Sequence, residues 1–157
     1  MTGRILSPLR LALTALLAAA VSSPALACPP QITVERPTGA MADSAFVLVH
    51  ASPGCQMGRL TVAGSAEGLV GGVRRSIPLD VAATETAGVY RVRRQWPSEG
   101  VWVLRLVVHV GEGSATALVG VDASGAIAVI RQQDPARRIY PYLTDADVDA
   151  MLRSLSR

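Results

Sequence analysis

The 157-residue chain carries 15 basic residues, all of them arginine, against 12 acidic ones, for a formal net charge of +3. The first 27 residues hold two of the arginines, so the remaining 130 residues carry 13 arginines against 12 acids. A balance this close to neutral lacks the positive surface that nucleic-acid binding needs, and one phenylalanine offers little surface for base stacking. The composition predicts no nucleic-acid partner, and the lack of lysine excludes Schiff-base chemistry.

The N-terminus has the features of a secretory signal peptide. Arg4 and Arg10 precede an apolar run over 11–21, and a small-x-small cleavage site follows at 25–27. The run is too short to cross a bilayer of about 30 Å. We therefore predict a signal peptide over 1–27 and a mature chain that begins near Cys28, has no transmembrane segment, and is periplasmic or secreted.

The two cysteines, Cys28 and Cys55, both follow the predicted cleavage site. An even number of cysteines in an oxidising compartment favours a disulfide, which would contribute roughly 3–4 kcal/mol in the chain-entropy model. Acylation of Cys28 would instead make the chain a lipid-anchored envelope protein, although Ala25 and Leu26 suit ordinary signal peptidase better. Free thiols and metal ligation remain further alternatives.

Short β-branched segments separated by Gly, Pro, Ser and Asp follow the signal peptide. This rhythm predicts an all-β sandwich over 28–135, followed by an extended connection and a helix over 136–157. The candidate strands are 32–36, 45–50, 59–66, 73–81, 88–95, 101–110, 115–121 and 126–131.

Residues 88–110 read as a hairpin whose two strands are joined through Pro97 and Gly100. In its second strand the even-numbered positions 102–110 are all apolar and predict the core side, which leaves the odd-numbered positions facing outward. In the first strand, Arg91 and Arg93 alternate with apolar residues, so we expect both arginines to face solvent.

The C-terminus changes to a helical period. Thr144 can cap a helix with Asp145 and Asp147 in its first turn, and apolar residues then recur at helical spacing: Val148, Met151, Leu152 and Leu155. We predict a short amphipathic helix that packs on the sandwich. Asp145, Asp147 and Asp149 also begin like a calcium loop, but Ala150 and Ser156 occupy the positions that need Gly and Glu.

Two segments carry a family resemblance: Thr86 to Val92, with Gly88-Val89-Tyr90, and Gly100 to Leu104, with Gly100-Val101-Trp102. They resemble exported immunoglobulin-like modules of the YtkA-like and FixH-like kind, and more distantly the CopC sandwiches. The Gly-x-Tyr also resembles the tyrosine corner of immunoglobulin-type sandwiches. The resemblance implies an immunoglobulin-like antiparallel β-sandwich with an accessory, non-catalytic role. Some relatives bind copper, but CopC proteins use an N-terminal histidine where this chain has Cys28.

His50, Cys55 and Met57 lie within eight residues and form the candidate metal site. Imidazole, thiolate and thioether ligands suit copper, and Cys28, Met41 and His109 could approach them. Oxidation of Cys55 would remove the best ligand. Copper handling is therefore the alternative function.

The candidate anion-binding residues are Arg91, Arg93, Arg105 and His109, which the predicted hairpin would align on one outward stripe. Guanidinium groups suit carboxylates and phosphates. Arginines on the solvent face of a sheet also serve solubility alone.

Enzyme signatures are weak in this sequence. Neither histidine belongs to a recognisable nucleophile–base arrangement, and the glycines at 64–72 lack the lysine of a phosphate loop. The sequence therefore predicts an exported, non-catalytic binding or accessory module of the cell envelope, with an envelope protein as one conceivable partner and no resident cofactor.

Overall fold

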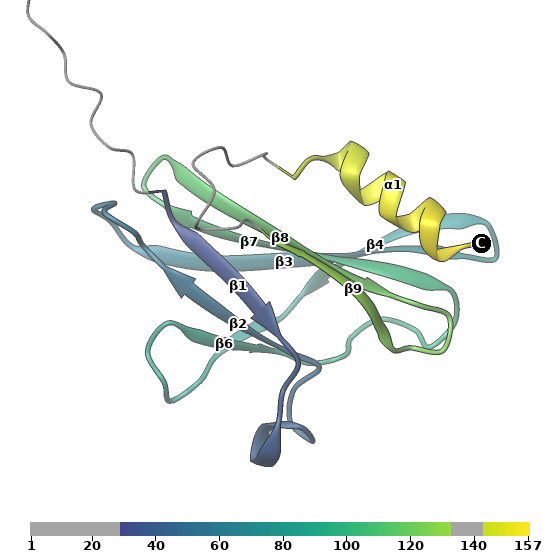
Figure 1. Ribbon diagram of the computed structural model, residues 1–157, viewed down its shortest axis with the longest axis horizontal. Coiled ribbons are helices and arrows are strands. Elements are labelled where there is room, and N and C mark those ends of the chain that lie inside the picture. Colours follow the sequence, from purple (N-terminus) through teal and green to yellow (C-terminus); the bar gives the residue numbers. More distant parts are fainter. Residues whose placement is uncertain (1–28, 133–142) are drawn as a thin grey trace, which may run out of the picture.

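The computed structural model describes residues 29–132 and 143–157, and within them the chain forms two antiparallel sheets and one α-helix. The four-stranded sheet has the order β1-β2-β6-β5, and the five-stranded sheet has the order β4-β3-β7-β8-β9 (Figure 1). The strands are β1 (Gln31–Glu35), β2 (Val47–Ser52), β3 (Leu60–Val70), β4 (Val73–Leu79), β5 (Val81–Ala83), β6 (Val89–Val92), β7 (Val101–Val110), β8 (Gly113–Val121) and β9 (Ile127–Gln132).

This strand order is that of an immunoglobulin-like sandwich. Strands β1, β2, β6 and β5 take the places of A, B, E and D, while β3, β7 and β8 take those of C, F and G. Strand β4 adds the usual extra strand beside C, and β9 extends the sheet beyond G. The predicted all-β, immunoglobulin-like fold is confirmed.

The core lies between the two sheets. On β7 the even-numbered residues from Trp102 to Val110 are fully buried, as the alternation predicts. Ile32 on β1 and Val47 and Val49 on β2 meet them from the other sheet, each with 1% or less of its surface exposed. This interdigitated layer makes the sandwich one packed body.

Each of the eight predicted strands has a counterpart, but the candidate 73–81 is divided. It splits at Asp80 into β4 and β5, which belong to different sheets. The Asp80 N–H donates to Gln95 Oε1 (2.9 Å), and Gln95 Nε2 donates to the Asp80 carbonyl (3.1 Å). Gln95 thus supplies the backbone groups at the crossing with hydrogen-bond partners that a ladder would otherwise provide.

The predicted hairpin 88–110 is wrong, because β6 and β7 lie in different sheets. The segment between them crosses the sandwich with Trp96 buried, its ring edge-on to Phe46 at 5.0 Å between ring centroids. The crossing also places Tyr90 inside β6, which takes the place of strand E. A tyrosine corner lies near the start of strand F, so that part of the resemblance does not hold.

Helix α1 (Asp145–Leu155) lies on the outer face of the five-stranded sheet (Figure 1), which confirms the prediction that it packs on the sandwich. Its Val148, Met151 and Leu152 are buried in one cluster with Val101, Val103 and Leu118. The odd-numbered positions 101 and 103 of β7 therefore lie on the outer side of the sheet, as predicted, but the helix and not solvent covers them. Gly120 permits this close approach, since a Cβ there would lie 3.2 Å from Met151 Sδ. No helix in the described part of the chain is long and apolar enough to cross a membrane.

The capping box of α1 provides a pH-dependent contribution to stability. Asp147 Oδ2 accepts hydrogen bonds from the Thr144 backbone N–H and from Thr144 Oγ1, both at 2.8 Å. These bonds lower the pKa of Asp147 from its ordinary value of 3.8. A lowered carboxyl pKa contributes stability that is complete above the unfolded-state pKa and is lost as the pH falls through the folded-state pKa.

We expect Asp147→Asn to be less stable than the wild type at neutral pH, because the charged acceptor is gone. The gap in free energy of unfolding should begin to narrow below about pH 3.8, where the Asp147 carboxylate of the unfolded chain becomes protonated, and should close once the pH falls below the lowered pKa of the folded state. Urea unfolding of both proteins at a series of pH values measures this gap. A gap that stays constant down to pH 2 would contradict the prediction.

Candidate binding surface

The outer faces of the two sheets differ. Helix α1 covers part of the five-stranded sheet, whereas no described element lies across the outer side of β1, β2 and β6 (Figure 1). We call the outer side of the whole four-stranded sheet, with β5 included, the open face. The strand registers place nine outward residues on it: Gln31, Thr33, Glu35, Leu48, His50, Ser52, Ala82, Val89 and Arg91.

A groove of about 780 Å³ crosses the open face. Leu48 and Val89 line it from the neighbouring strands β2 and β6, and Leu48 is only 8% exposed although it points away from the core. Met41, from the short 3-10 helix Gly39–Met41, and the loop 84–86 also line the groove. An apolar floor with a few polar groups at the rim is typical of a ligand site.

His50 lies at the rim of this groove and pairs with Glu35. Its Nε2 is 2.9 Å from Glu35 Oε1, and the two side chains are 42% and 57% exposed. A side-chain contact this exposed contributes at most about 1 kcal/mol. The contact links the His50 side chain on β2 to Glu35 on β1 and leaves both side chains exposed.

A second hollow of about 300 Å³ lies beside the groove, and Arg91 lines both. Its other lining residues come from the crossing at β5 and from the chain after β6: Asp80, Ala82, Arg93, Arg94 and Gln95. We call it the arginine hollow. Sequence reasoning missed Arg94 and Ala82; the adjacent Arg93-Arg94 pair was the available signal.

The three residues of the predicted metal site are not assembled around a common point. His50 lies on the open face, whereas Met57 is 92% exposed in the turn between β2 and β3. Cys55 is in the same turn and is not a free thiol, and Cys28 lies outside the described residues. Within 29–132 and 143–157, no group of three or more His, Cys, Asp or Glu residues could hold a metal ion. Of the other residues expected near this site, Met41 lines the groove together with His50.

The predicted anion-binding stripe is divided between the two sheets. Arg91 and Arg93 belong to β6 and the residues after it, while Arg105 and His109 lie on β7 in the other sheet. Arg105 Nη1 already donates to Asp145 Oδ1 on the helix at 2.5 Å. The four residues therefore do not share one surface, because the hairpin that aligned them does not form.

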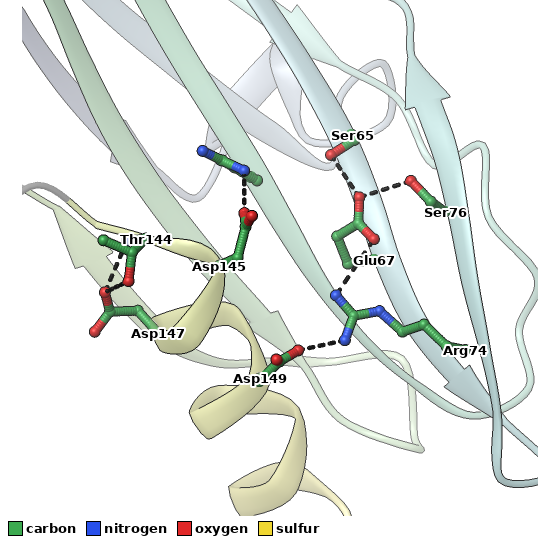
Figure 2. Close-up of polar contacts among 9 residues, drawn as sticks. Ser65, Glu67, Arg74, Ser76, Thr144, Asp145, Asp147 and Asp149 are labelled. Carbon is green, nitrogen blue, oxygen red and sulfur yellow. Dashed lines mark hydrogen bonds and ion pairs between the residues drawn. The ribbon is translucent and has the colours of Figure 1, made fainter.

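Polar side chains of β3, β4 and α1 form a hydrogen-bonded network on the outer face of the five-stranded sheet, next to the helix (Figure 2). Glu67 accepts hydrogen bonds from Ser65 Oγ (2.9 Å) and Ser76 Oγ (2.7 Å), and its carboxylate lies 3.5 Å from Arg74 Nη2. Arg74 also pairs with Asp149 on α1, and this hydrogen bond raises the pKa of Arg74. The network fixes the helix to β3 and β4.

The three aspartates that begin like a calcium loop are engaged separately. Asp145 pairs with Arg105, Asp147 caps the helix, and Asp149 pairs with Arg74 (Figure 2). Asp145 and Asp147 lie in the first turn of α1, where the helix dipole favours negative charge. The helix interpretation of this segment is confirmed.

Together, the strand order and the covering helix define an immunoglobulin-like β-sandwich with one outer sheet face that no described element covers. The chain matches no family model, no curated protein and no solved structure.

Proposed function

We propose that the protein is an exported, non-catalytic binding or accessory module of the cell envelope that contacts its ligand through the open face. The observation that carries the proposal is the difference between the two sheets. Ion pairs and apolar contacts close the outer face of one sheet beneath α1, while the other keeps a groove of about 780 Å³. A small fold that leaves an apolar-floored groove uncovered has a surface suited to binding.

The residues before the sandwich support export. The signal-peptide features of 1–27 favour a periplasmic or secreted protein. Cys55 is not a free thiol, and Cys28 is the other cysteine of the chain, so we propose that the two pair. Such a pair would leave no Cys28 thiol for acylation, which argues against the lipid-anchored alternative.

Membership of the YtkA-like and FixH-like group is part of the same proposal. The strand order of the sandwich supports the fold that this resemblance implies. Copper handling through His50, Cys55 and Met57 remains the competing function, but the exposed Met57 and the oxidised Cys55 favour it less. We treat the module as non-catalytic because the sequence offers no nucleophile–base pair.

The groove can be tested by filling it. Val89→Trp would place a large ring on the groove floor, while Val73→Trp adds the same ring at a 59% exposed position on β4 of the other sheet. We expect fractionated small molecules and proteins from the native envelope to shift amide resonances of β2, β6 and the loop 84–86. The shifts should disappear in Val89→Trp and persist in Val73→Trp.

Two results would contradict the proposal. Shifts that map to α1 or β9 instead of the open face would place the binding surface elsewhere. Turnover of a substrate by the purified protein would show that it is an enzyme.

A further inference from the structure

The arginine hollow lies at the edge of the four-stranded sheet, above a small residue. Ala82 on β5 is directly opposite Arg91 on β6 in the strand register. Because Ala82 carries only a methyl group, it leaves the floor beside the Arg91 side chain open. Arg91 and Arg93 are two residues apart on the same side of the chain, which separates their backbones by about 7 Å.

The arginines of this hollow differ from those under the helix in their ion pairs. Arg74 and Arg105 both pair with carboxylates of α1. Among the described residues, neither Arg91 nor Arg93 makes such a pair. Arg91 and Arg93 line the hollow together with one carboxylate, Asp80, so these three side chains leave an excess of one positive charge.

Neighbouring groups hold this wall in place. Arg93 Nε donates to the Ser44 carbonyl at 3.2 Å, which anchors the side chain and leaves its terminal nitrogens for a ligand. Arg94 Nη2 donates to the Pro97 carbonyl at 3.2 Å, and its guanidinium carbon lies 6.0 Å from the centre of the Trp96 ring. Its Nη1 lies beside Gly125 in the turn between β8 and β9, where a Cβ would be 2.7 Å away, so the Arg94 guanidinium is directed toward the other sheet and Arg91 and Arg93 supply the hydrogen-bond donors of the hollow.

We propose that the arginine hollow binds a phosphate group, with Arg91 and Arg93 donating to its oxygens above Ala82. The inference rests on the proposed binding function and names the ligand chemistry at one end of the open face. A phosphate monoester carries a charge of about −1.5 to −2 at pH 7 and three acceptor oxygens, so it can accept hydrogen bonds from both guanidinium groups at once. Guanidinium groups donate to phosphate oxygens in paired, planar geometry. The phosphate could belong to a lipid headgroup or to a soluble phosphate ester.

The test is a titration of the purified exported protein with inorganic phosphate and with glycerol phosphate at low ionic strength, followed by amide resonances. We expect saturable shifts at 80–82 and 91–95. Arg91→Gln should weaken binding at least tenfold. Ala82→Leu should weaken it as much without any change of charge, because the larger side chain fills the hollow. Asp80→Asn should tighten binding by removing the opposing carboxylate.

Arg75→Gln is the matched control, since it removes one positive charge from the exposed surface of β4. It should change the affinity less than twofold. Equal weakening by Arg75→Gln and Arg91→Gln, or unchanged binding in Ala82→Leu, would show diffuse attraction and overturn the proposal. Acetate binding as tight as phosphate binding would also overturn it.

Vesicles separate the two sources of the phosphate. Sedimentation with vesicles that contain phosphatidic acid, lost in Ala82→Leu, would identify a lipid headgroup; binding of glycerol phosphate without vesicle binding would identify a soluble ester. Binding of neither would reject the phosphate inference. The groove test with Val89→Trp uses other residues, so the proposed function can survive that failure.

Discussion

Replacing Trp102 by alanine is expected to lower the free energy of unfolding by about 3–5 kcal/mol. The Trp102 side chain is fully buried near the start of β7, and its indole N–H donates to the Glu99 carbonyl at 2.8 Å. Its ring also covers Gly68 on β3: a Cβ built on Gly68 would lie 2.3 Å from the ring. The variant therefore loses a large apolar burial and leaves a cavity that β3 cannot fill.

The contact with Gly68 makes this prediction testable as a coupling. Gly68→Ala alone should cost about 1–3 kcal/mol, because the ring has to move. In the Trp102→Ala background the same substitution should cost almost nothing, since the clash no longer exists. Urea unfolding of the four proteins gives the coupling energy. If the two substitutions changed the free energy of unfolding additively, the contact between Trp102 and Gly68 would be contradicted. The control is Thr61→Ala, at an exposed position of β3, which should change the free energy of unfolding by no more than about 0.5 kcal/mol.

The local signals of the sequence located the strands but not their sheets. Alternation over 101–110 predicts β7 and its core side because successive side chains of a strand face opposite ways. Turn residues between two strands mark a reversal of the chain, but they are compatible with a hairpin and with a crossing between sheets. The segment crosses between the sheets because that path buries Trp96 against Phe46, a tertiary contact that the local sequence does not reveal.

This ambiguity explains the errors at the candidate sites. Arg91 and Arg93 alternate with apolar residues, as predicted, but Arg105 joined them only through the hairpin that does not form. Val101 and Val103 are buried because helix α1 packs on them. The apolar periodicity of the helix predicts that it packs on the sandwich but not which strands it covers. The groove also escaped prediction, because Met41 and the loop 84–86 meet β2 and β6 only in the folded chain.

Met151→Asp is expected to detach helix α1 from the sandwich and to lower the free energy of unfolding by several kcal/mol. Met151 is 2% exposed among Val101, Val103 and Leu118, where an unpaired carboxylate would lose its hydration without gaining a partner. The helix can avoid that cost only by leaving the sheet. Detachment would expose the three apolar residues beneath it and break the Arg74–Asp149 and Arg105–Asp145 pairs.

Ala150→Asp is the matched control, because it adds the same charge one residue earlier on the exposed side of α1. We expect it to keep the helix docked and to change stability by no more than about 0.5 kcal/mol.

Hydrogen exchange should show lost protection in α1 for Met151→Asp alone, while the strands of the core stay protected. Since the open face belongs to the other sheet, phosphate binding at the arginine hollow should survive in the folded fraction of Met151→Asp. Protection of α1 equal to that of the wild type would show that the apolar contacts do not hold the helix. Loss of phosphate binding would show that the two outer faces are coupled through the core.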